Sequence, residues 1–269
     1  MARNRTQLES HRPLLAWATD YAGDIRMPEH EDGRSHLSLV LAGRVRESFG
    51  GREVSQETLG VALKSADARH VTRFGPEGAR IASIDLQALS RQERGGFGLS
   101  SLPAWRWLPG RQILPEVRAT IAALVDYRHC PDCPQALDVL REAALLLTDA
   151  FRDGASTERA KIDGWLRTVR EHIDDEPSQT VPVARLAEQA DVSATHLSRR
   201  FRAAFGVSVT TYRNLRRVQM ALVRLTRSES RLADVAADCG FHDQSHFTRH
   251  FRRLVGVTPG AWRDHVRER

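Results

Sequence analysis

The apolar residues of the chain follow two different periods, and the change falls near residue 113. Before it, apolar residues gather in short runs separated by glycine or charged residues, a pattern typical of antiparallel strands. Gly50-Gly51 follows one of these runs and predicts a hairpin turn. The pattern predicts a small β-barrel or sandwich, with strands at residues 36–42, 44–49, 59–63 and 80–86.

From Ile113 onward the apolar residues recur at the spacing of a helix. Two segments, 114–125 and 137–151, each place them on one stripe, which predicts two helices packed on a core. Cys130 and Cys133 lie between them with the spacing of half a zinc site or a redox pair. No second pair follows, so we interpret this segment as a structural turn, with metal binding or redox sensing as the alternative. An odd cysteine count of three predicts no disulfide framework.

A short polar segment, residues 152–157, lacks apolar periodicity and is expected to link two domains. A chain of 269 residues has room for both. The first domain would span residues 1–152 and the second 157–269. In the second, the pattern predicts a helix with apolar residues from Ile162 to Ile173, a helix opened by Pro182, and a long helix from about residue 209 to 226.

The most informative pattern lies at residues 231–263. A short apolar helix ends at Gly240, which supplies the permissive backbone of a tight turn. Asp243 is a suitable N-cap for a second helix. That helix would bury a stripe of apolar residues and end before Pro259. Two short helices joined by a tight turn form a helix-turn-helix, whose second helix enters the major groove of DNA.

The same pattern occurs fifty residues earlier, at residues 192–213. Ser193 stands where Asp243 stands, again as an N-cap. Such a fixed-period repeat predicts two helix-turn-helix units in one chain. The matched pairs are His196 with His246, Arg199 with Arg249, Phe201 with Phe251, Arg202 with Arg252, Gly206 with Gly256, Tyr212 with Trp262, and Arg213 with Arg263.

The segment from about residue 160 to 269 resembles the DNA-binding domain of the AraC/XylS family of bacterial transcription regulators. The run GF-x-D-x-S-HF-x-R-x-FRR-x-x-G-x-TP-x-x-WR, residues 240–263, carries the resemblance. The first half resembles, loosely, the cupin-like ligand domain often found ahead of it. The resemblance implies an α+β protein: a cupin-like β-barrel with following helices that sense an effector and dimerise, then an all-α domain with two helix-turn-helix units.

Carried over by position, the resemblance implies which side chains meet DNA. Polar side chains opposite the apolar stripes are expected to read base edges, and further arginines to contact phosphates. The base-reading candidates are Thr195, Ser198, Arg199, Arg200, Gln244, Ser245, Thr248 and Arg249. The phosphate candidates are Arg202, Arg213, Arg216, Arg217, Arg252, Arg253 and Arg263.

The distribution of charge agrees with an interface for nucleic acid in the second half. Residues 157–269 hold 20 basic and 14 acidic side chains, whereas residues 1–156 hold 20 of each. The whole excess of +6 therefore lies on the half with the repeat, as attraction to phosphates requires. The scarcity of lysine could reflect genome composition, but composition does not explain the location of the surplus.

Three histidines of the first half, His30, His36 and His70, are the candidates for an effector pocket. They fall near the places where metal-binding cupins keep their histidines. The close His-x-His pair is missing, and Ala66 stands near the place of a usual proline, so we predict no metal and no cofactor. A pocket for a small organic effector is the expectation.

The sequence thus predicts a DNA-binding transcription regulator, an activator rather than a repressor, and not an enzyme. The expected partners are double-stranded DNA, RNA polymerase, a small-molecule effector and a second copy of the chain in a homodimer. No long apolar run or signal-peptide core occurs, so we expect a cytoplasmic bacterial protein, nucleoid-associated when bound, with no membrane partner. The alternatives are a cupin-type metal-dependent enzyme, an alkylation-repair sensor using Cys130 or Cys133, and an interaction protein.

Overall fold

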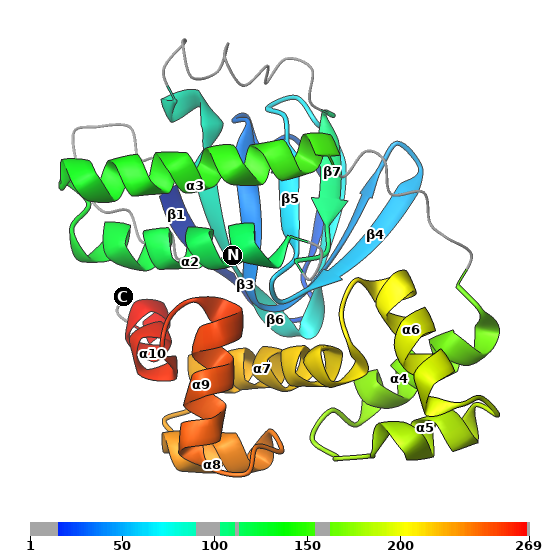
Figure 1. Cartoon of the computed structure of the whole chain (residues 1–269). Helices are drawn as coiled ribbons and strands as arrows, with labels where there is room; N and C mark the ends of the chain where they lie inside the picture. The colour runs from blue at the N-terminus through cyan, green and yellow to red at the C-terminus, as the bar shows by residue number, and fades with distance from the viewer. Residues whose placement is uncertain (1–15, 90–102, 111–112, 154–161, 268–269) are drawn as a thin grey trace. The chain divides into compact units, whose positions relative to one another are not determined.

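The computed structural model describes residues 16–89, 103–110, 113–153 and 162–267, and Figure 1 shows its elements. The fold divides into two compact units: residues 1–155 together with 265–269, and residues 156–264. Of the expected linker, 152–157, the first two residues belong to the end of a helix that closes at Asp153, and the other four lie outside the described residues.

The first unit contains a seven-stranded antiparallel sheet. Its hydrogen-bonded path runs β1-β6-β3-β5-β7, while β2 pairs with β6 and β4 with β3. Within the described residues β1 and β7 end this path without pairing with each other, so the sheet is open where the sequence analysis expected a closed barrel. The strands are β1 Ala16–Tyr21, β2 Arg26–His30, β3 His36–Phe49, β4 Arg52–Glu57, β5 Val61–Lys64, β6 His70–Asp85 and β7 Trp105–Leu108.

The predicted strands are present, but two of them form one. The predicted strands 36–42 and 44–49 are joined through Gly43, whose φ of +88° accompanies a shift in register against β6. A Cβ at Gly43 would overlap the main chain at Gly78, so glycine lets the two strands approach. The hairpin at Gly50-Gly51 is confirmed: both have positive φ, and Phe49 pairs with Arg52.

Two helices follow the sheet, as the period predicted: α2, Leu114–His129, and α3, Pro134–Asp153. Figure 1 shows them side by side in front of the sheet. Arg106 on β7 donates to the Phe151 carbonyl on α3 at 3.0 Å, which ties the helix to the sheet. The turn between the helices is also present. Contrary to the expectation of no disulfides, Cys130 and Cys133 form one across this turn.

The second unit is helical, and α7 is its long central element, as predicted. Helix α7 contacts α4 and α6 as well as α8 and α9 (Figure 1). Pro182 is the N-cap of α5, one residue before the first-turn position expected. The helices are α4 Gly164–Asp175, α5 Val183–Gln189, α6 Ala194–Phe205, α7 Val209–Arg227, α8 Leu232–Asp238, α9 Gln244–Val255 and α10 Pro259–Arg267.

A helix must be both long and apolar to cross a bilayer. In the described part of the chain, no helix is both long enough and apolar enough to cross one.

Candidate nucleic-acid interface and ligand pocket

Helices α6 and α9 begin and end in the same way. The Ser193 hydroxyl accepts from the His196 amide at 3.2 Å, and the Asp243 carboxylate accepts from the His246 amide at 2.6 Å. Each side chain satisfies an amide that has no partner within its helix. Both helices end at a glycine in the left-handed conformation, at residues 206 and 256. The predicted caps are therefore confirmed.

The turns that precede these helices differ. In the first, Asp191 takes a φ of +53°, whereas in the second Gly240 takes +78°. A Cβ at Gly240 would overlap the Ser178 carbonyl, so only glycine fits there. The second turn is one residue longer, because α5 and α8 begin 49 residues apart while α6 and α9 begin 50 apart.

Each of the two helices buries an apolar stripe and exposes a polar face. Leu197 and Phe201 on α6, and Phe247 and Phe251 on α9, are fully buried. The predicted base-reading side chains lie away from these stripes; all are exposed except Thr248, which is half-buried. Of them, Arg200 donates to the Asp163 carboxylate at 2.7 Å.

The predicted phosphate contacts separate into two groups. Arg202, Arg252 and Arg253 are exposed, and none forms an ion pair with another described residue. By contrast, Arg213 and Arg217 have exposed fractions of 7% and 5%. Buried arginines cannot meet a phosphate at the surface, so we withdraw both from the proposed interface.

The buried arginines hold loops in place. Arg213 donates to the Val181 carbonyl at 2.6 Å, and its counterpart Arg263 donates to the Ser230 carbonyl at 2.8 Å. Both carbonyls lie just before the first helix of their helix-turn-helix. Arg217 donates to the carbonyls of residues 177, 178 and 179 and to the Thr180 hydroxyl, at 2.7–3.2 Å. The sequence pattern did not predict this role, because the direction of an arginine side chain depends on partners that lie far away along the chain.

Arg216, the remaining predicted phosphate contact, lies between these two groups. Its side chain is 17% exposed and forms an ion pair with Asp174 at 2.9 Å. It also donates to the Gln219 side chain at 2.8 Å. The structure therefore leaves this guanidinium partly accessible, but already engaged on α4 and α7.

The first unit contains a cavity of about 190 Å³. All three predicted pocket histidines line it, although His30 comes from β2, His36 from β3 and His70 from β6. Asp32, Lys64 and Glu47 line it too, and these three were missed by the sequence analysis. The available signal for Asp32 was its place two residues after His30, where a carboxylate stands instead of the second histidine of a His-x-His pair.

The ring nitrogens of the three histidines are oriented by the main chain. The Nδ1 atoms of His30, His36 and His70 each lie 2.8 Å from a carbonyl oxygen two residues earlier. A carbonyl only accepts, so each Nδ1 carries the proton, and in a neutral ring Nε2 keeps its lone pair. Burial, and then the charge of Lys64, lower the pKa of His36 and of His70.

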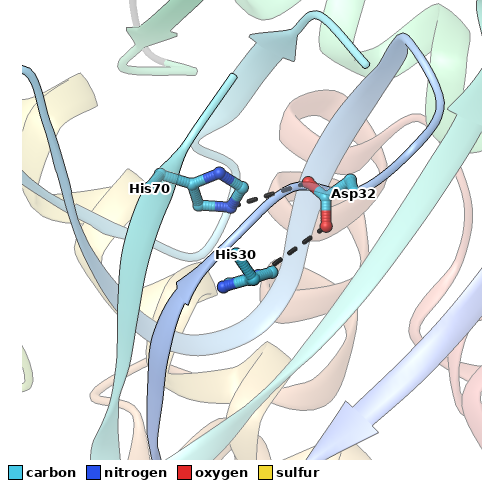
Figure 2. Close-up of side chains that lie close together, drawn as sticks. All are labelled: His30, Asp32 and His70. Carbon is cyan, nitrogen blue, oxygen red and sulfur yellow. Dashed lines mark ion pairs between the residues drawn. The ribbon is translucent and has the colours of Figure 1, made fainter. Parts of the chain in front are cut away.

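The Nε2 atoms point toward one carboxylate. They lie 3.8 Å (His30), 3.6 Å (His36) and 3.6 Å (His70) from the oxygens of Asp32. Figure 2 shows the rings of His30 and His70 facing the carboxylate of Asp32, each joined to it by a dashed line that marks an ion pair. These separations are longer than hydrogen bonds, so the cluster leaves space between its polar atoms.

Glu47 and Lys64 form a buried ion pair beside this cluster. The Lys64 ammonium donates to Glu47 at 2.6 Å, and both side chains are almost fully buried. The indole nitrogens of Trp105 and Trp107 also donate to Glu47, at 3.0 and 2.7 Å. Burial alone would raise the pKa of Glu47, but Lys64 and these donors outweigh it and hold the pKa at about 2. The lysine charge is thus already compensated.

Comparison with known proteins agrees with the geometry of the second unit. Residues 186–265 match the family model described as a helix-turn-helix domain. The chain is 30% identical over 180 residues to the HTH-type transcriptional activator RhaR of Klebsiella pneumoniae, covering 64% of this chain and 62% of that protein. It is 26% identical over 129 residues to the arabinose operon regulatory protein of Escherichia coli, covering 48% of this chain and 43% of that protein.

A solved structure is also similar to part of this chain. The DNA-binding domain of AdpA, in complex with a target DNA, is 30% identical to this chain, with a TM-score of 0.37. The match covers 39% of this chain and 95% of that one.

Two statements follow from the repeat, its caps and these matches. The second unit is a helix-turn-helix domain of the kind found in DNA-binding regulators. Over part of its length, the chain is similar to transcription regulators that include RhaR and RhaS. It spans less than two thirds of the length of the relatives RhaR and RhaS that it matches.

Proposed function

We propose that this protein is a sequence-specific DNA-binding transcription regulator that reads two adjacent major-groove segments with one monomer. The observation that carries this proposal is the pair of identically capped helices, α6 and α9, each with an exposed polar face. Both contact the long helix α7, which would hold them at a set separation. Major-groove segments on one side of DNA recur about every 34 Å.

The base contacts would come from the exposed faces of the two helices. Arg199 and Arg249 have the chemistry for bidentate bonds to guanine, and Gln244 for bonds to adenine. Ser198, Ser245, Thr195 and Thr248 can meet several base edges. Arg200 is a weaker candidate, because Asp163 holds its guanidinium.

The phosphate contacts would come from Arg202, Arg252 and Arg253, with Arg263 and Arg216 in support. Attraction to phosphates supplies affinity without sequence preference. The excess of positive charge in residues 157–269 supports this division of labour.

The first unit is proposed to be a cupin-like sensing and dimerisation domain, residues 1–152, joined to a DNA-binding domain, residues 157–269. The cavity lined by His30, His36 and His70 supports effector binding. Val139 and Leu146 on α3 are exposed by 46% and 45%. They lie seven residues apart, and therefore on one side of the helix, which supports a homodimer formed through α3.

The proposal also includes the effect on transcription and the location of the protein in the cell. Regulation by recruiting RNA polymerase, and activation rather than repression, are supported by relatives that bear the name of transcriptional activators. A cytoplasmic site, with nucleoid association when bound, follows from a partner that is DNA.

We propose no catalysis. For the repair alternative, Cys130 and Cys133 are joined in a disulfide, and burial raises the pKa of the Cys239 thiol to about 11. A thiol with such a pKa is a poor nucleophile near neutral pH.

Selection from a pool of random DNA duplexes by the full chain tests the proposal. We expect enrichment of a motif with two parts about 10–10.5 base pairs apart. The double variant Arg199→Ala/Arg249→Ala should lose this motif while keeping weak, salt-sensitive binding. Failure of the unaltered chain to enrich any motif at moderate ionic strength would overturn the proposed function.

A further inference from the structure

The cavity of the first unit contains a cluster of donors built from two paired strands. His30 on β2 and His70 on β6 are direct partners in the antiparallel register, and their rings lie 4.4 Å apart. Asp32 follows His30 by two residues and places its carboxylate against both rings (Figure 2). One ligand atom from each of these three residues lies within 4.8 Å of the other two.

The distances between these three side chains fit an ion bound by all of them better than direct hydrogen bonds between them. The two Nε2 atoms stand 3.8 and 3.6 Å from the Asp32 oxygens, beyond hydrogen-bond length. Two ligands at about 2.0–2.1 Å from one zinc ion in tetrahedral geometry stand roughly 3.3–3.5 Å apart. One ligand atom of each residue already lies within 4.8 Å of the other two, so a movement of about 1 Å in the partly exposed side chains of His30 and Asp32 would close the site on an ion.

The orientation of the rings is that of metal ligands. A metal-bound histidine almost always donates its other ring nitrogen to a carbonyl or carboxylate, which fixes the tautomer. Both His30 and His70 do so, to the carbonyls of Pro28 and Ala68. Because the main chain holds each Nδ1, each Nε2 keeps its lone pair. The lone pair of His70 lies 3.5 Å from the Lys64 ammonium, a weak contact that a bound ion would replace.

Charge and size favour a cation over an organic anion. Asp32 has no cation within hydrogen-bond distance among the described residues; Lys64 is 3.8 Å away and is bonded to Glu47. The cavity of about 190 Å³ is smaller than the roughly 300–1,000 Å³ of pockets for organic ligands. The other charged residues at the cavity are paired: Arg34 with Asp85, and Glu31 with Arg69.

We propose that His30, Asp32 and His70 bind a divalent ion of the zinc class, and that this ion is the effector, or part of it. Two imidazoles and one carboxylate suit such borderline ions better than Mg²⁺ or Ca²⁺, which prefer oxygen. The ion would cross-link the end of β2 to the start of β6. The regulatory part of this proposal rests on the proposed function, whereas the site itself does not.

Titration of the metal-stripped full chain with zinc tests the site without DNA. We expect one ion per chain, and cobalt in its place should give the visible absorption of a site with nitrogen ligands. Asp32→Asn and His30→Gln change partly exposed side chains that a folded chain can lose. Each should weaken zinc binding at least about tenfold, as loss of even an outer partner commonly does. Unchanged circular dichroism would show that the variants are folded.

His129→Ala is the matched control, because this histidine is exposed, lies outside the cavity and adjoins the only disulfide in the described residues. It should leave zinc affinity unchanged. The site is refuted if the unaltered chain binds no zinc, or if His129→Ala abolishes binding while Asp32→Asn does not.

The regulatory part is tested by measuring the affinity of the zinc-loaded and zinc-free chain for the selected DNA. A difference that disappears in Asp32→Asn supports it, and equal affinities overturn it. If neither form prefers any DNA, the proposed function fails, while the zinc titration still decides the site.

Discussion

The two helix-turn-helix motifs of this chain agree in what they present and differ in how they are held. Their second helices share an N-cap, a glycine end and an exposed arginine two residues before a buried phenylalanine. The arginines Arg213 and Arg263 even donate to equivalent carbonyls, at Val181 and Ser230. On the exposed faces, the hydroxyl side chains at 195/245 and 198/248 and the arginines at 199/249 and 202/252 are repeated, whereas Gln244 and Arg253 stand where α6 has alanine.

Apart from these arginine bonds, the supporting contacts differ between the motifs. The first motif uses Asp191 in its turn and fastens Arg200 to Asp163. The second uses Gly240 and is packed against the loop at residues 177–180, which Arg217 holds. The two copies of a repeat can therefore keep similar exposed side chains while the contacts that hold each copy differ.

The largest effect is expected at Arg217, which holds the loop at residues 177–180 through four hydrogen bonds. Arg217→Ala would leave the buried bond to the Pro177 carbonyl and the partly buried bonds to residues 178 and 179 unmade, and should lower the free energy of unfolding of the second unit by roughly 3 kcal/mol. Arg263→Ala, which removes one bond at the surface, should cost about 1 kcal/mol or less. Chemical denaturation of both variants measures the difference. Equal losses would contradict the assigned role of Arg217.

The turns supply the next test. Gly240→Ala would force a Cβ into the Ser178 carbonyl at a positive φ, so we expect a loss of about 2 kcal/mol. Asp191→Gly should change stability by less than about 1 kcal/mol, because glycine gains freedom in the unfolded chain as it relieves the left-handed backbone. Thermal unfolding compares them. If Gly240→Ala leaves the unfolding temperature unchanged, the second turn is no tighter than the first.

The repeated surface predicts paired effects on DNA. Arg249→Ala should cost about 1–3 kcal/mol of binding and relax preference at one base pair. Arg199→Ala should do the same at a base pair about one helical turn away. Binding to a panel of single-base variants of the selected site measures both. A uniform loss over the whole panel would instead make the residue a phosphate contact.

The smallest effect on DNA binding is expected for the arginines next to these proposed base contacts. Arg252→Ala and Arg202→Ala should each weaken binding evenly on all sequences and lower the slope of log affinity against log salt by about one unit. Affinities at several salt concentrations provide the slope. A changed base preference in either variant would show that this arginine contacts a base and not only a phosphate.

The fold of the second unit could be predicted from local signals. Caps at Ser193 and Asp243, glycines at 206 and 256, and phenylalanines at helical spacing all act within a few residues along the chain. Helical contacts are short-range, so sequence pattern and structure agree there. The sheet was less predictable, because β1, β2 and β7 are short and gain their order from pairing with β6 and β5.

The amino-acid sequence by itself determined the two capped, amphipathic reading helices, because every interaction that defines them is local. Only the tertiary structure decided that Arg213 and Arg217 face inward, since their partners lie more than thirty residues away. It alone brought His30, Asp32 and His70 together, through the pairing of β2 with β6. A strand's partner is selected by packing over the whole sheet, and no spacing along the chain records it.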